Sequence, residues 1–364
     1  MTIQDDQRFD LLDGLRGIAA LMVLVYHVSL ENGLNYLPGA WAAVDLFFLL
    51  SGFVIMHSYA AKINQGMTLA HFLKVRLIRL LPLYFIGLML GMSAAFAGLL
   101  NNDSDHLTAG GIVQSSVLGV FMIPYGRYTA WMGLSHVGGD NVFPLDPPAW
   151  SLFFELLVNV IFFAWIARFK TIRLPFVLAA VAIFLLARFH SGYAHPGWTA
   201  HNFIYGLPRV TAEFFLGTLI YMHHARLSPH LARLSLGLSA AAFGLFLTDN
   251  ASLLLLDILL LTPLAITSNA AVRIAEFGKK ACTTLGEISY PLYITHVPIL
   301  QTELRVFHIG RFPPAVQLAI VCVTATASAL LLAKLDKVIR KRLMHTLLPA
   351  ERKATIKQEG ASAP

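Results

Sequence analysis

Long apolar stretches separated by short polar segments dominate the sequence. A helix needs about 20 apolar residues to cross a bilayer. Stretches of that kind lie at 12–30, 42–60, 80–100, 149–167, 174–190, 203–222, 235–249, 251–269, 283–301 and 315–334. We therefore predict an all-α, polytopic membrane bundle of about ten transmembrane helices within residues 1–348, followed by a polar and disordered tail at 349–364.

The composition supports a membrane protein. Of the 364 residues, 57% are hydrophobic and only 13% are charged, whereas an ordinary soluble domain is about one-quarter charged. The net charge of +7 does not indicate a nucleic-acid partner, because the basic residues form short clusters between apolar stretches. With the N-terminus inside, most of these clusters fall on the cytoplasmic side, so both termini are predicted to be cytoplasmic. The acidic N-terminus, MTIQDDQRFD, lacks the basic region of a cleaved signal peptide.

One long connection interrupts the pattern of spans. Residues 101–148 contain the apolar run GIVQSSVLGVFMIPY, which is too short and too polar to span. We expect an excursion on the outer side that is either re-entrant or lies in the interface. It carries Trp131, His136 and a Gly-Gly-Asp turn at 138–140. Loops of this length are often functional, and a substrate lid is one interpretation.

The first apolar stretch, LDGLRGIAALMVLVYH, holds two ionisable residues eleven positions apart, Arg16 and His27. Eleven steps of about 100° return to within roughly 20° of the same helix face, about 16 Å further along the axis. A hydrogen-bonded core histidine is the structural alternative, but polar groups inside a membrane usually have a function. A neutral imidazole is suited to act as general base near neutral pH.

The second stretch begins GAWAAVDLFFLLSGFVI and carries Asp45 near its outer end. A short link joins the first two stretches, so they are expected to be antiparallel neighbours with Asp45 and His27 in the same half of the bilayer. In one interpretation the Asp45 carboxylate has a structural role in capping or packing the helix. In the other it orients the His27 imidazole, as the third member of a catalytic triad does.

Two arginines one helical turn apart, Arg76 and Arg79, occur in HFLKVRLIRLLPLY. Two interpretations explain these arginines equally well: they only fix the orientation of the protein in the membrane, or they bind a ligand. In the binding hypothesis they form, with Arg16 and Lys74, a site for a phosphorylated cytosolic ligand, since guanidinium groups bind phosphate in a bidentate manner.

Further polar residues lie near the predicted outer side. Trp150 and Glu155 occur at the start of the fourth stretch. Arg209 precedes Glu213 by four positions, so this pair could simply neutralise itself. His296 lies in GEISYPLYITHVPIL, at a depth similar to that of His27. Cys282 and Cys322 show no metal-ligand spacing, so neither a metal site nor a disulfide scaffold is expected.

Taken together and in order, these motifs resemble the acyltransferase-3 family of integral membrane acyltransferases. The resemblance rests on LDGLRGIAALMVLVYH, VDLFFLLSGFVI, RLIRLLPLY, PPAWSLFFEL, EFFLGTLIY and GEISYPLYITH. It implies transfer of an acyl group, commonly acetyl from acetyl-coenzyme A, to a hydroxyl of a carbohydrate, glycolipid or other small acceptor in the bacterial inner membrane. No permanently bound cofactor is implied. Many relatives carry a further domain of the SGNH type, and we expect a stand-alone form here.

The resemblance also implies roles for individual residues. It marks Arg16, His27, Arg76 and Arg79 as functionally important. We expect the three arginines to bind the acyl-coenzyme A donor, and His27 to act as general base or acyl relay with Asp45 and Glu155. The predicted acceptor-binding residues are Trp150, Arg209 and His296. A proton-coupled transporter of an anionic or acylated solute is the main alternative, since buried His, Asp and Glu also serve transport. A purely structural membrane subunit is a third interpretation.

Overall fold

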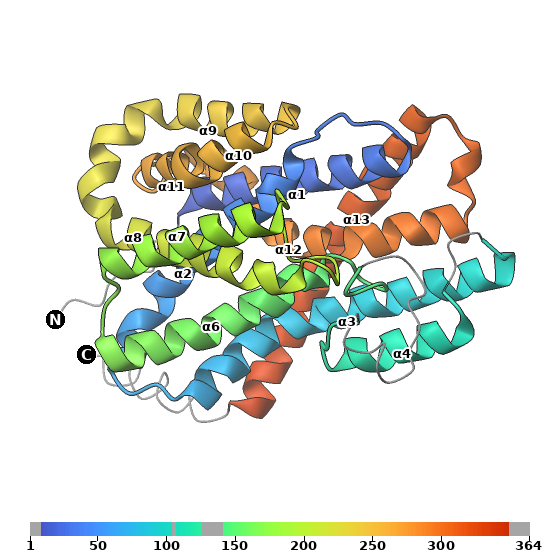
Figure 1. Ribbon diagram of the computed structural model, residues 1–364, viewed down its shortest axis with the longest axis horizontal. Helices are drawn as coiled ribbons and strands as arrows, with labels where there is room; N and C mark the ends of the chain where they lie inside the picture. The colour runs from blue at the N-terminus through green and yellow to red at the C-terminus, as the bar shows by residue number, and fades with distance from the viewer. Residues whose placement is uncertain (1–8, 104–106, 126–140, 349–364) are drawn as a thin grey trace.

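The computed structural model describes residues 9–103, 107–125 and 141–348. In these ranges it is a bundle of long helices lying roughly side by side (Figure 1). The principal helices are α1 (Asp10–Glu31), α2 (Ala43–Asn64), α3 (Leu69–Asn101), α4 (Ala109–Val120), α6 (Ala149–Phe169), α7 (Leu174–Ser191), α8 (Gly206–Leu231), α9 (Ser235–Gly244), α10 (Ala251–Leu256), α11 (Thr262–Asn269), α12 (Glu276–Arg305) and α13 (Pro314–Leu347). Short 3-10 turns and one π-helical turn, Asp257–Leu261, connect some of them. The described residues form no β-strand, only one isolated bridge between Asn141 and Thr199.

The predicted all-α membrane architecture is confirmed. Within the described ranges, eight helical stretches are long and apolar enough to cross a membrane. The segments predicted at 203–222 and 235–249 belong to one continuous helical stretch, Phe203–Leu247. Helix α12 is absent from the eight because polar side chains and two prolines interrupt its apolar sequence. The cytoplasmic placement of the termini stays a prediction.

Helices α1 and α12 pack as a close parallel pair. A Cβ added at Gly17 would lie 2.4 Å from Leu285 Cβ, and one at Gly14 would lie 2.8 Å from Cys282 Sγ. Small residues let helix backbones approach in a membrane, where packing rather than the hydrophobic effect joins helices. Both contacts move toward the C-terminus on both helices, so the helices run parallel. This interface therefore fixes the axial position of each α1 side chain relative to α12.

Helices α2 and α8 approach even more closely through reciprocal glycines. A Cβ at Gly52 would lie 1.9 Å from Phe214 O, and a Cβ at Gly217 would lie 2.0 Å from Leu49 O. No side chain fits at either position without separating the helices. The sequence SGFVI in α2 therefore serves helix packing through its glycine.

The described parts of the connection between α3 and α6 fold back against the bundle. The phenol of Tyr84 donates a hydrogen bond of 2.6 Å to Gly119 O at the end of α4. Leu145 O lies where a Cβ of Gly91 would stand, so the segment before α6 packs directly on the α3 backbone. Trp131, His136 and the turn at 138–140 lie outside the described residues, as does the tail at 349–364, so the lid and tail predictions stay predictions.

Candidate active site

A cavity with polar groups in a largely apolar lining opens between α1, α2, α3, α6 and α12. It holds about 850 Å³ of empty space, including the space at its mouth. The lining residues are Arg16, Val44, Phe47, Phe48, Leu50, Ser51, Val54, Ile55, Arg76, Arg79, Leu80, Ser151, Leu152, Glu155, Ser289, Tyr290, Tyr293 and Ile294. Helix α2 contributes a mostly apolar wall that includes one hydroxyl, that of Ser51, and the other polar groups come from the other four helices.

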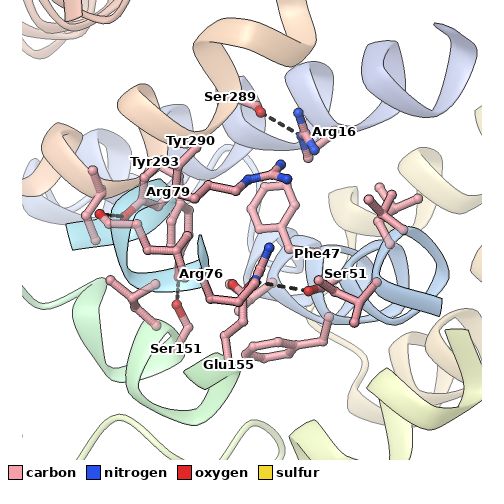
Figure 2. A pocket seen from close by; sticks show the side chains of 18 residues that line it. Arg16, Phe47, Ser51, Arg76, Arg79, Ser151, Glu155, Ser289, Tyr290 and Tyr293 are labelled. Atoms are coloured by element: carbon pink, nitrogen blue, oxygen red, sulfur yellow. Dashed lines mark hydrogen bonds and ion pairs between the residues drawn. The ribbon is translucent and has the colours of Figure 1, made fainter. Parts of the chain in front are cut away.

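Three guanidinium groups point into this cavity (Figure 2). Arg16 comes from α1, whereas Arg76 and Arg79 come from successive turns of α3 and share one face. The predicted clustering of these three arginines is therefore what the structure shows. Lys74, also on α3, is exposed and does not line the cavity.

The three arginines differ in how many hydrogen bonds and ion pairs they already form with other protein groups. Arg76 is only 3% exposed and forms an ion pair with Glu155 at 2.5 Å. Arg16 donates hydrogen bonds of 2.8 Å to Ser289 Oγ and Gly286 O, and lies 3.4 Å from Asp13.

Arg79 is half-buried, and within the described residues no hydrogen bond or ion pair engages its guanidinium group. It is thus the cation most available to an anionic ligand.

Glu155 lies at the centre of the cavity's polar contacts. Its Oε1 accepts from Arg76 and also from the Ser51 hydroxyl at 3.1 Å. These two contacts hold the carboxylate in place, so the arrangement favours a positioning role over proton abstraction. The fourth apolar stretch thus delivers its carboxylate to the arginine site predicted for the donor.

Several hydroxyl groups also line the cavity. The sequence places Ser151 beside Trp150 and Glu155 without assigning it a role, and sequence reasoning did not single out the other hydroxyls. Ser151 Oγ and Tyr293 Oη lie 2.8 Å apart, Ser289 receives the Arg16 hydrogen bond, and Tyr290 donates to Leu80 O. The three α12 residues are spaced so that they share one side of that helix. This spacing in GEISYPLY is the signal from which they could have been found.

His27 and His296 form a pair one turn beyond the cavity. His296 Nε2 lies 3.1 Å from His27 Nδ1, and their ring centroids are 4.9 Å apart. Neither ring is among the cavity's lining residues. The ring of Tyr293, which does line it, lies 6.0 Å from that of His296. His296, predicted to bind the acceptor, therefore contacts His27 directly.

Asp45 does not contact His27 as expected. Its two carboxylate oxygens accept hydrogen bonds from Arg209 Nε at 2.6 Å and Nη2 at 2.8 Å. Both side chains are almost fully buried. This bidentate pair engages both carboxylate oxygens, because α2 packs on α8 rather than presenting Asp45 to α1.

Arg209 is the centre of a second polar cluster that lies outside the cavity. Glu213 Oε1 is 3.6 Å from its Nε, so the expected i, i+4 pair is present but weaker than the pair with Asp45. Trp41 and Trp150 place their rings 6.0 and 5.4 Å from the guanidinium carbon, a cation–π arrangement. Trp150 and Arg209 thus share this cluster, and their predicted role in acceptor binding stays a prediction.

The same cluster extends into the loop after α7. Arg209 Nη1 donates to Pro196 O at 3.0 Å, and the ring of His195 stacks on Trp41 at 4.5 Å. Burial, reinforced by the nearby Arg209 cation, lowers the pKa of His195 to about 4. The loop is therefore joined to the bundle by a neutral histidine.

The geometry supports one kind of chemistry. A half-open cavity with converging cations can bind phosphate groups, and an imidazole pair lies one helical turn further along α12. Among the described residues, no group of three or more His, Cys, Asp or Glu side chains is arranged to hold a metal ion.

Comparison with known proteins gives consistent results. A family model described as "Acyltransferase domain" matches residues 9–334. "Protein 2 in picA locus" of Rhizobium radiobacter is 37% identical over 195 residues, which cover 51% of this chain and 97% of that protein. "Exopolysaccharide production protein ExoZ" of Rhizobium meliloti is 25% identical over 82% of this chain and 88% of its own length.

A longer relative also matches. "Peptidoglycan O-acetyltransferase OatA" of Listeria monocytogenes is 24% identical over 86% of this chain. The matched region covers 53% of that protein, so the chain spans about half of its length. No solved structure matches the chain.

Proposed function

Because the chain belongs to the acyltransferase-3 family of membrane enzymes and is an acyltransferase, we propose that it moves an acetyl group from acetyl-coenzyme A to a hydroxyl of a carbohydrate or glycolipid. The observation that carries the choice of donor is the convergence of Arg16, Arg76 and Arg79 on one cavity. Coenzyme A is a polyanion with phosphate groups at one end and the reacting thioester at the other. The choice of acceptor draws on relatives named for peptidoglycan acetylation and exopolysaccharide production.

In this proposal the donor's phosphates bind the arginines and its acyl end extends along α12. Arg79, which forms no hydrogen bond or ion pair with a described residue, contributes the principal new contact. Glu155 holds Arg76 in place, and Ser289 and Gly286 do the same for Arg16. The acyl end then lies beside Ser151 and Tyr293, at the side of the cavity nearest the histidine pair.

His27 is the proposed general base. It removes the proton from the acceptor hydroxyl as the oxygen attacks the thioester carbon. The new C–O bond forms, the C–S bond breaks, and the imidazolium returns the proton to the departing thiolate. A general base of this kind contributes about 10²- to 10⁴-fold to the rate. Tyr293 lines the cavity and its ring lies 6.0 Å from that of His296, so in this proposal the Tyr293 ring moves as the reacting groups approach the histidine pair.

The testing experiment uses the full chain purified in lipid nanodiscs. Acetyl-coenzyme A labelled in the acetyl group is supplied with a polysaccharide acceptor, and ester-linked label is counted. The proposal predicts label on the acceptor with an equal amount of free coenzyme A, and loss of both in the His27→Ala variant.

The transporter alternative gives the opposite result. In sealed proteoliposomes it predicts uptake of a labelled anionic solute without ester formation or coenzyme A release. That outcome would refute the proposed transfer reaction. The bacterial inner membrane as location follows from a cytosolic donor and is tested by membrane fractionation.

A further inference from the structure

The contacts of the histidine pair determine where its protons lie. His296 Nδ1 is 2.7 Å from Tyr293 O and 3.2 Å from Leu292 O, both on its own helix. Carbonyl oxygens only accept hydrogen bonds, so Nδ1 of His296 must carry a proton. In a neutral ring the other nitrogen, Nε2, then has only its lone pair.

The same reasoning fixes the second ring. His27 Nδ1 is 3.0 Å from Val23 O and 3.1 Å from His296 Nε2, both of which are acceptors. His27 Nδ1 therefore carries a proton that it shares between them, and His27 Nε2 is left unprotonated. The reverse assignment would give His296 protons on both nitrogens, and hence a positive charge beside Nδ1 of His27.

Other groups that could orient His27 are committed elsewhere. Asp45, the carboxylate expected in this role, has both oxygens bound by Arg209. Glu155 is bound by Arg76 and Ser51. The Val23 carbonyl lies on the same helix as His27, so His296 is the contact to this ring from another helix that fixes its orientation.

The helix packing explains why the two rings meet. Gly14 and Gly17 bring α1 against α12 in parallel, and Arg16 reaches Ser289 near one end of the interface. His27 reaches His296 further along the same two helices. The interface that positions the donor-site arginine therefore also sets the distance between the histidines.

We propose that His296 is a positioning residue that holds His27 in the Nδ1–H tautomer and directs its bare Nε2 toward the acceptor hydroxyl. The inference rests on the proposed function, because it assigns a purpose to the tautomer of the general base. The aspartate of a serine protease triad fixes its histidine in a comparable way. Here a neutral imidazole takes that place, which avoids a further charge within the membrane.

The test combines kinetics with nitrogen NMR of the full chain labelled with ¹⁵N-histidine in nanodiscs. The His27 resonances are assigned by subtraction of the His27→Gln spectrum. His296→Gln keeps an acceptor oxygen near the position of Nε2, whereas His296→Leu removes it at similar size. A thermal melt establishes that each variant is folded.

We expect wild type and His296→Gln to show His27 protonated at Nδ1 and bare at Nε2. In His296→Leu we expect a mixture of both tautomers and a fall in kcat of at least about tenfold. Coenzyme A affinity should stay unchanged, because His296 lies outside the cavity.

The proposal is overturned if His27 in wild type is protonated at Nε2, a result that needs no variant to fold. It is also overturned if His296→Leu keeps the wild-type tautomer or the wild-type kcat. Failure of the proposed function looks different, since the tautomer would be as described while His27→Ala retained full transfer.

Discussion

Arg79 offers the sharpest test of the donor site. The Arg79→Ala change removes a half-buried guanidinium group and breaks no hydrogen bond or ion pair within the described protein. Arg76→Ala is less informative because it deprives Glu155 of its partner. Removing one member of a buried pair can cost about 3–5 kcal/mol in stability.

The size of the effect follows from the contact that is lost. A hydrogen bond to a charged group contributes about 1.5–3 kcal/mol, and about 1.4 kcal/mol is a factor of ten in Kd. The corresponding range is about 10- to 150-fold weaker binding. Because Arg79 is half-exposed, solvent screens its charge, and we expect the lower end, about tenfold.

The assay is equilibrium binding of coenzyme A to nanodisc-embedded protein at low and high salt. Arg226→Ala is the matched control, because Arg226 is an exposed α8 arginine outside the cavity. The difference between Arg79→Ala and wild type should shrink at high salt. Equal Kd values for wild type and Arg79→Ala, or an equal loss in the control, would refute the docking site.

Three further predictions concern the scaffold. Gly217→Ala should lower the free energy of unfolding by about 1–3 kcal/mol, because its Cβ would stand 2.0 Å from a carbonyl oxygen of α2. Gly237 has open space around it, so in the same denaturation assay Gly237→Ala should not lower the free energy of unfolding. Asp45→Asn should lower the free energy of unfolding by about 3 kcal/mol by weakening the partner of buried Arg209, yet leave the Kd for coenzyme A unchanged. A weaker Kd for coenzyme A would place the cluster in the donor site. The pKa of His195 is lowered to about 4, so the unfolded chain binds a proton near pH 6.5 that the folded chain takes up only near pH 4. The melting temperature should therefore fall as the pH drops from about 6.5 to 4, and His195→Asn should reduce that fall.

The sequence predicted most accurately the features that depend on residues close together in the chain. Arg76 and Arg79 share a helix face by their spacing alone, and their entry into one cavity with Arg16 followed from the apolar pattern and the family motifs. The helical architecture was likewise predictable, because apolar stretches of spanning length have few alternatives to a helix in a membrane.

Partner choice between helices was not predictable in the same way. Asp45 was expected beside His27 because their helices are consecutive, but α2 packs most closely on α8 through Gly52 and Gly217, which gives Asp45 to Arg209. The main neighbour of α1 is α12, far away in sequence. Tyr293 was missed, and Ser151 received no role, because a hydroxyl in an apolar helix carries no distinct signal until its neighbours are known.

The most direct test of the account is the rate of acetyl ester formation by His27→Gln in nanodiscs, with labelled acetyl-coenzyme A and a polysaccharide acceptor. His57→Gln is the control, because His57 is a half-buried α2 histidine bound to Tyr221 Oη and outside the cavity. The account predicts a loss in kcat of about 100-fold or more for His27→Gln, with coenzyme A affinity unchanged and the control close to wild type. Ester formation by His27→Gln within a few-fold of wild type would contradict it.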